Sequence, residues 1–220
     1  MYIVFIGPPG VGKGTQASRL VDKYAMVKIS TGDLLRDSIK ENTHLGNRAK
    51  SYMEKGELVP DQLVLDLVNE KIYSPSNGKH SYIFDGFPRT IQQAKELDRM
   101  LNNHKSEISL VLEFTMDEED RISRLSGRRI CPRCQRTYHI LYAKPKNDLL
   151  CDVCEVPLIQ RSDDNEEVIR QRSSVYWEMT NPLLDFYSHR NILRTIDVNR
   201  SIDNIFTELD SMISLLEKKQ

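Results

Sequence analysis

A glycine-rich loop between a short apolar run and a helical stretch is the strongest constraint on how this chain folds. The run Tyr2 to Ile6 is continuously apolar, as is typical of a strand buried on both faces of a sheet. The loop that follows matches the pattern G-x-x-x-x-G-K and reads Gly7-Pro8-Pro9-Gly10-Val11-Gly12-Lys13-Gly14-Thr15. Its backbone N–H groups and the next helix N-terminus can face phosphate oxygens, and its lysine can reach the β- and γ-phosphates. The sequence therefore predicts a nucleoside triphosphate site, and the alternative is a Gly/Pro turn with a surface lysine.

Strand and helix signals alternate along the rest of the chain. Short apolar runs predict further strands at 27–29, 81–84, 108–114 and 192–196. Helical periodicity predicts helices at 15–24, 31–39, 46–55, 60–72, 90–101, 117–126, 164–189 with a break at Asn181-Pro182, and 202–218. This alternation predicts an α/β protein, a P-loop three-layer fold around a central, mostly parallel five-stranded sheet. Residues 128–160 have no long helical period and are interpreted as an insertion.

Two polar segments follow the predicted strands 27–29 and 81–84. Asp85 lies at a strand's carboxyl end, where open α/β sheets bind ligands, and is placed to orient Mg²⁺ and its water ligands. Arg89 follows it on a tight Gly/Pro turn. The segment Ser30 to Arg36 offers a hydroxyl and a guanidinium at a helix start, which can hold another phosphate. A helix cap and a solvated turn are the alternatives, but next to the P-loop the two segments favour a second phosphate site.

All four cysteines lie in the predicted insertion. The spacing is C-x2-C-x16-C-x2-C, formed by Cys131, Cys134, Cys151 and Cys154. It predicts a zinc ribbon whose four thiolates leave no open position, so the metal is expected to be structural. Iron in the same cage and pairing as two disulfides are the alternatives. The nearby His139 is predicted to pack or lie on the surface, not to bind the metal.

The charge balance and hydropathy exclude some classes of function. The formal net charge is -1, so no overall positive field attracts nucleic acid or an anionic membrane. No segment approaches the ~18 apolar residues of a membrane span, and the N-terminus does not resemble a signal peptide. We therefore expect a cytoplasmic protein that binds neither nucleic acid nor membranes.

The sequence resembles the adenylate kinase family over nearly its whole length. Gly14 separates Lys13 from the hydroxyl of Thr15, a loop form similar to that of nucleoside monophosphate kinases. The other segments that carry the resemblance are Ser30 to Arg36, Asp85 to Thr90, Gly127-Arg128-Arg129, and Arg161-Ser162-Asp163-Asp164 with Arg170 and Arg172. It implies reversible, Mg²⁺-dependent phosphoryl transfer from ATP to AMP, giving two ADP, by a monomer of the long-lid bacterial type.

The resemblance also implies a division of the chain and a set of site residues. The core would be 1–29, 61–126 and 165–220, with an AMP-binding insertion at 30–60 and a zinc lid at 127–164. ATP would contact Gly10, Val11, Gly12, Lys13, Gly14, Thr15, Arg128, Thr137, Tyr138 and Arg200. AMP would contact Thr31, Arg36, Glu57, Leu58, Val59, Gly86, Phe87, Pro88, Arg89, Gln93, Arg161 and Arg172. The catalytic residues would be Lys13, Arg89, Arg128, Arg161 and Arg172, with Asp85 holding Mg²⁺ through water.

Several positions leave alternatives open. Arg124 and Arg129 fit a site or a surface equally well, whereas Arg133 and Arg136 are expected mainly on the surface. Val198 stands where many family members have glycine, which weakens the expectation for Arg200. Thr31 and Gln93 favour adenine as the acceptor base. The competing functions are a kinase for another nucleoside monophosphate and a zinc-ribbon nucleic-acid binder with an ATPase core.

Overall fold

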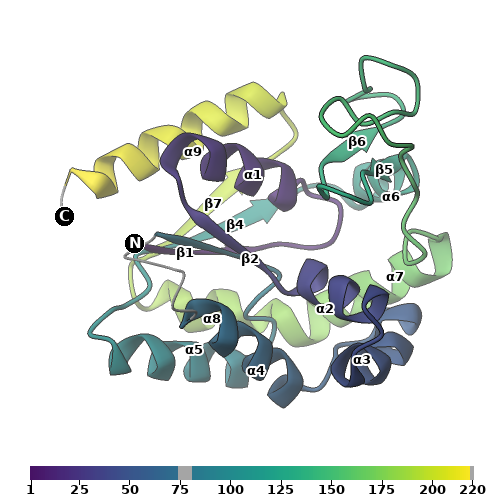
Figure 1. The fold of residues 1–220 in the computed structure, drawn as a ribbon. Coiled ribbons are helices and arrows are strands. Elements are labelled where there is room, and N and C mark those ends of the chain that lie inside the picture. The colour runs from purple at the N-terminus through teal and green to yellow at the C-terminus, as the bar shows by residue number, and fades with distance from the viewer. Residues whose placement is uncertain (74–80, 219–220) are drawn as a thin grey trace.

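A parallel sheet lies at the centre of the protein (Figure 1). The structure is a computed structural model that describes residues 1–73 and 81–218, so parts of the predicted core ranges 61–126 and 165–220 lie outside the described residues. The five strands are β1 (Tyr2–Ile6), β2 (Val27–Ser30), β3 (Tyr82–Asp85), β4 (Leu110–Thr115) and β7 (Leu193–Asp197). They pair in the order β2-β3-β1-β4-β7, and every pairing is parallel. The predicted five-stranded α/β fold is confirmed.

Helices cover both faces of this sheet, which explains why its central strands β1, β3 and β4 are mainly apolar and buried. Helices α1 (Lys13–Tyr24) and α9 (Ile202–Glu217) lie on one face, and α4 (Asp61–Ile72), α5 (Ile91–Asn103) and α8 (Pro182–Ser188) lie on the other (Figure 1). Successive side chains of a strand point to opposite faces. In β1, Ile3 and Phe5 therefore pack into the core beneath α1 and α9, whereas Val4 and Ile6 pack into the core on the other side.

Two segments project from the core beside the carboxyl edge of the sheet. One is the helix pair α2 (Thr31–Lys40) and α3 (His44–Lys55). The other contains the hairpin of β5 (Arg128–Ile130) and β6 (Thr137–His139), between α6 (Glu118–Ser126) and α7 (Glu166–Val175). Figure 1 shows these two segments at the same end of the molecule, with the hairpin segment above the helix pair. Both are thus placed to approach a ligand bound at this edge.

The predicted helix 164–189 is divided into three parts. After α7, the residues Tyr176–Thr180 form one turn of π-helix, in which the N–H of Asn181 donates to the carbonyl oxygen of Tyr176 at 2.9 Å. Pro182 then begins α8, where its missing N–H leaves no helical hydrogen bond unmade. The predicted break is therefore at the right position, but the π-turn before it and the short β5–β6 hairpin were not predicted.

Within residues 1–73 and 81–218, no helix has both the length and the apolar character needed to cross a membrane.

Candidate active site

The P-loop joins the central strand β1 to α1 and turns through backbone conformations that favour glycine. Gly10 has φ 94° and Gly12 has φ 89°. A Cβ atom on Gly10 would lie 2.9 Å from the carbonyl oxygen of Arg121. A side chain at this position would therefore clash with α6 and would also strain the backbone at this positive φ. The loop is thereby held against α6 with its N–H groups and the N-terminus of α1 on its ligand side.

Lys13 lies at the start of α1 and folds back over the loop. Its Nζ donates to the carbonyl oxygens of Gly7 at 2.6 Å and Pro8 at 2.9 Å. Burial lowers the pKa of Lys13 to about 8, with Asp85 opposing this shift and Arg89, Arg172 and Arg128 adding to it. An anion beside this lysine would stabilise its charged form.

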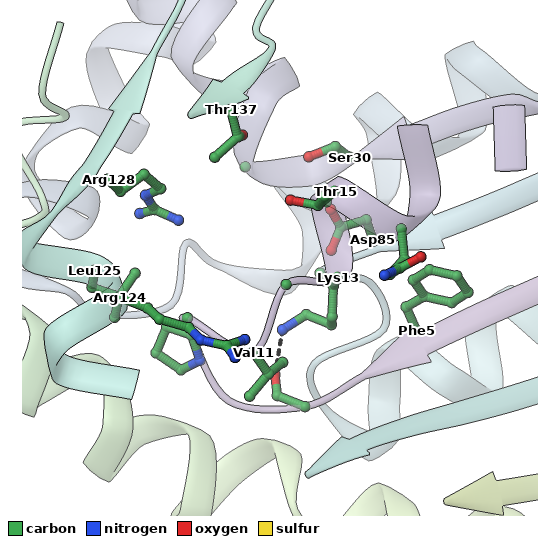
Figure 2. Close-up of a pocket in the computed structure, with 18 of the residues that line it drawn as sticks. Phe5, Val11, Lys13, Thr15, Ser30, Asp85, Arg124, Leu125, Arg128 and Thr137 are labelled. Atoms are coloured by element: carbon green, nitrogen blue, oxygen red, sulfur yellow. Dashed lines mark hydrogen bonds between the residues drawn. The ribbon is translucent and has the colours of Figure 1, made fainter. Parts of the chain in front are cut away.

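A cavity of about 640 Å³ opens above the P-loop. Figure 2 shows Lys13, Thr15 and Asp85 facing Arg124 and Arg128 across it, with Thr137 of β6 on the side of the hairpin segment. Every residue expected to contact ATP lines this cavity: Gly10 to Thr15, Arg128, Thr137, Tyr138 and Arg200. Four arginines expected to contact AMP line it too: Arg36, Arg89, Arg161 and Arg172. Folding thus gathers positive charge from α2, the loop after β3, the hairpin segment and α7 around one space.

Three buried or half-buried aspartates hold four of these arginines in place: Arg36, Arg128, Arg161 and Arg172. Asp33 pairs with Arg36 at 2.5 Å and with Arg161 at 3.4 Å. Asp163 accepts from Arg172 at 2.9 Å, and the fully buried carboxylate of Asp164 binds the guanidinium of Arg128 through two hydrogen bonds. These pairings orient the guanidinium groups before any ligand arrives, which is the arrangement required for electrostatic catalysis.

The clustering of positive charge also changes pKa values. Burial lowers the pKa of Arg89 to about 10, and Arg172 adds to this shift. Burial raises the pKa of Asp33, but Arg36, Lys28 and Arg161 together bring it well below its ordinary range. The cavity therefore contains buried cations whose charged forms a bound phosphate group would stabilise.

A smaller cavity of about 50 Å³ adjoins the first. Nearly all the residues expected to contact AMP line it: Thr31, Arg36, Glu57, Leu58, Val59, Gly86, Arg89, Gln93 and Arg172. The hydroxyl of Thr31 donates to the carbonyl oxygen of Gly86 at 2.7 Å, and Arg89 Nε donates to the same oxygen at 2.8 Å. Gln93 accepts from the backbone N–H of Arg89 and donates to Asp61. These bonds connect the wall of the small cavity to the loop after β3.

Three of the expected AMP residues lie differently. Pro88 and Arg161 line the large cavity. Phe87 is fully buried, and its ring packs against that of Phe84 with the centroids 6.1 Å apart. The side chain of Phe87 belongs to the core, so only its backbone is available to a ligand.

Asp85 and Thr15 provide oxygen atoms beside the P-loop. A Cβ on Gly14 would lie 3.4 Å from Asp85 Oδ2, and the ammonium of Lys28 lies 3.8 Å from the same oxygen. The site therefore already accommodates a cation next to this carboxylate. Mg²⁺ prefers one or two carboxylates with water and phosphate oxygens, so this donor set fits it.

The structure resolves some of the open alternatives. Arg124 and His139 both line the large cavity. The sequence left a site and a surface position equally open for Arg124, and it did not predict a cavity position for His139. His139 is buried, and its Nδ1 accepts from the backbone N–H groups of Leu141 and Tyr142, so of the two predicted alternatives, packing and surface, the structure shows packing. Arg133 and Arg136 are exposed, as expected. Arg200 lies at the rim and pairs with Glu208.

The four cysteines converge in the hairpin segment. Their sulfur atoms all lie within 4.8 Å of one another, and none of the four forms a disulfide. Cys131 and Cys151 are buried in a small cluster with Tyr138, against which Val156 and Leu158 pack. The predicted four-cysteine site is thus present, its tetrad of thiols fits a tetrahedral metal ion, and the two-disulfide alternative is wrong.

The P-loop lies at the carboxyl end of the central strand, and the cavity above it adjoins a second cavity lined by arginines. This arrangement defines a phosphotransferase that uses two nucleotides. The sequence model of the family described as adenylate kinase matches residues 5–192. An adenylate kinase of Thermodesulfovibrio yellowstonii is 47% identical over 219 residues, covering 100% of each chain. Adenylate kinases of Archaeoglobus fulgidus and Chloroherpeton thalassium are 43% and 44% identical, each covering 99% of this chain and 100% of the relative. The chain belongs to the adenylate kinase family, whose members are ATP:AMP phosphotransferases.

Proposed function

We propose that this protein transfers the γ-phosphoryl group of ATP to AMP, reversibly, at the junction of the two cavities. The observation that carries the proposal is the convergence of Lys13 with Arg89, Arg128, Arg161 and Arg172 on one space. A site that only hydrolysed ATP would need no second, arginine-lined cavity beside the first.

The large cavity is the proposed ATP site. The loop Gly10 to Thr15 would cradle the phosphates with its N–H groups, and Lys13 would leave its backbone contacts to reach the transferred phosphoryl group. Thr137, Tyr138 and Arg200 would lie along the nucleoside. To these we add Arg124, because its guanidinium lies in the same cavity.

The small cavity is the proposed AMP site. Arg36 and Arg89 would bind the acceptor phosphate bidentately, which the planar guanidinium allows. Thr31, Gln93 and Gly86 would surround the adenine, with Glu57, Leu58 and Val59 along the nucleoside. Phe87 would contribute only its backbone, and Pro88 would contact AMP from the large cavity. Because Thr31 and Arg89 share the carbonyl oxygen of Gly86, the base contact and the phosphate contact would be coupled.

Phosphoryl transfer at this site would rely on positioning and charge. An AMP phosphate oxygen is already ionised at neutral pH, so no general base is required. Lys13, Arg128, Arg161 and Arg172 would stabilise the charge on the moving group. Asp33, Asp163 and Asp164 would hold the three arginines in place. Asp85, through water, and Thr15 would hold Mg²⁺, which when bound neutralises part of the triphosphate charge and aligns its oxygens.

We propose that the hairpin segment, residues 127–164, is a lid over the core 1–29, 61–126 and 165–220, and that residues 30–60 form the AMP-binding insertion. Zn²⁺ on the four cysteines would give the lid the folding energy that its small apolar cluster cannot supply. Free thiols fit a reducing, cytoplasmic location, and the net charge of -1 fits a protein with no nucleic-acid or membrane partner. We further propose that the protein acts as a monomer.

A coupled assay of ADP formation from ATP and AMP tests the proposal. Wild type should transfer with AMP as the best acceptor among AMP, GMP, UMP and CMP. Lys13→Ala should reduce turnover by about 100-fold or more, because a well-placed donor to a transition state contributes about 3–4 kcal/mol. The matched control is Lys50→Ala on the exposed face of α3, which should leave turnover unchanged. Unchanged turnover in Lys13→Ala, or AMP as the poorest acceptor, would contradict the proposal.

A further inference from the structure

Lys28 lies beside the phosphate loop and has no part in the function proposed above. It stands on β2 before the buried Ile29, and its side chain is 22% exposed. Its Nζ is 3.4 Å from Asp33 Oδ2 and 3.8 Å from Asp85 Oδ2. A Cβ on Gly14 would lie 3.8 Å from the same Nζ. One ammonium group thus stands at the meeting point of two carboxylates and the P-loop backbone.

Its partners distinguish Lys28 from the other cations of the cavity. Four arginines of the cavity pair with Asp33, Asp163 and Asp164, namely Arg36, Arg128, Arg161 and Arg172. Among residues 1–73 and 81–218, Lys28 is the ion-pair partner of Asp85. It also bridges Asp85, on the side of the proposed metal, to Asp33, which orders Arg36 and Arg161 on the acceptor side.

We propose that Lys28 is a positioning residue that holds Asp33 and Asp85 in the nucleotide-free protein and weakens their affinity for a free divalent cation. Two carboxylates turned toward one point attract a cation, and an ammonium already at that point opposes a second one. Mg²⁺ bound by one or two carboxylates otherwise relies on phosphate oxygens. Lys28 therefore favours entry of the metal together with the triphosphate, because the negative charge of the triphosphate exceeds the positive charge of one lysine. This inference rests on the role proposed for Asp85.

Binding of Mn²⁺ to the nucleotide-free, zinc-loaded protein tests the inference, with free Mn²⁺ measured by electron paramagnetic resonance at constant ionic strength. Lys28→Gln should bind one Mn²⁺ about tenfold more tightly than wild type, because a full positive charge within 4 Å is removed. Lys28→Arg keeps the charge and should behave like wild type. The matched control is Lys50→Gln, which removes a lysine paired with Glu54 at 3.9 Å on an exposed helix face. Equal Mn²⁺ affinity in wild type and Lys28→Gln would overturn the inference.

A double variant locates the metal. Adding Asp85→Asn to Lys28→Gln should abolish the gain in affinity, and a gain that survives would show that the metal binds elsewhere and refute the role of Lys28.

A measurement on the wild-type protein keeps the inference testable if Lys28→Gln folds poorly. With ¹³C-labelled lysine, the Cε signal of Lys28, assigned by comparison with Lys28→Arg, should move on addition of Mg·ATP but not of Mg²⁺ alone. An equal movement with Mg²⁺ alone would contradict the inference. Failure of the proposed function would appear separately, as absence of phosphoryl transfer by wild type, and would leave the Mn²⁺ comparison unaffected.

Discussion

Raising the pH from 7 to 9 should weaken ATP binding while leaving AMP binding nearly unchanged. The cause is Lys13, which is enclosed in the large cavity. Burial lowers its pKa to about 8, with Asp85 opposing the shift and Arg89 adding to it. The phosphates of ATP favour the charged form of Lys13, so the pKa of this group must be higher in the complex than in the free protein.

The magnitude follows from the titration of the free protein. With a pKa of about 8, Lys13 is about nine-tenths protonated at pH 7 and about one-tenth protonated at pH 9. ATP binding must then take up a proton, and its apparent Kd should rise about tenfold over these two pH units. Burial lowers the pKa of Arg89 only to about 10, so the affinity for AMP should stay nearly constant over the same range.

Isothermal titration calorimetry in two buffers of different ionisation enthalpy measures both the Kd and the proton uptake. Lys13→Arg is the control, because its guanidinium remains charged and should remove the pH dependence. Equal ATP affinity at pH 7 and pH 9, or an equal loss of AMP affinity, would refute the reasoning.

The same titration also affects stability. Because the pKa of Lys13 is lower in the folded protein than in the unfolded chain, the free energy of unfolding of the nucleotide-free protein should increase as the pH rises from about 8 toward 10.

Three further perturbations test other parts of the structure. Removing the metal from the four cysteines should lower the melting temperature and increase hydrogen exchange in residues 128–160 first, because their own apolar cluster is small; equal stability with and without metal would exclude a structural role. Gly46→Ala should destabilise the packing of α3 on α2 by about 2 kcal/mol or more, since the new Cβ would lie 2.1 Å from the carbonyl oxygen of Ser38, and this exceeds the ~1 kcal/mol that alanine adds to helix stability. Urea unfolding measures this loss, with the exposed Ser51→Ala of the same helix as control. Thr31→Ala should raise the KM for AMP several-fold and reduce the preference for AMP over CMP, because it removes the hydroxyl that is bonded to Gly86; an unchanged KM ratio would exclude Thr31 from base selection.

Local chemistry accounts for what could be predicted about the site. The P-loop follows from glycines next to a buried strand, and the carboxyl-edge position of Asp85 and Arg89 follows from the strand that precedes them. The positions of Ser30 to Arg36 at a helix start were likewise evident, and Ser30 caps α2 through the N–H of Asp33. Each of these features depends on neighbours within a few residues.

The sequence by itself thus determined the alternation of strands and helices, the phosphate loop and the four-cysteine motif, because each is specified by residues close together in the chain. The tertiary structure alone decided the strand order β2-β3-β1-β4-β7, the position of Arg124 in the large cavity and the partners of the arginines. Arg161 and its partner Asp33 are 128 positions apart. In the sequence, Lys28 is an ordinary residue of a short strand, and only the folded structure places its ammonium group between Asp33 and Asp85. Such pairings depend on how the sheet, the helix pair α2–α3 and the hairpin segment meet in space, and no local pattern encodes that arrangement.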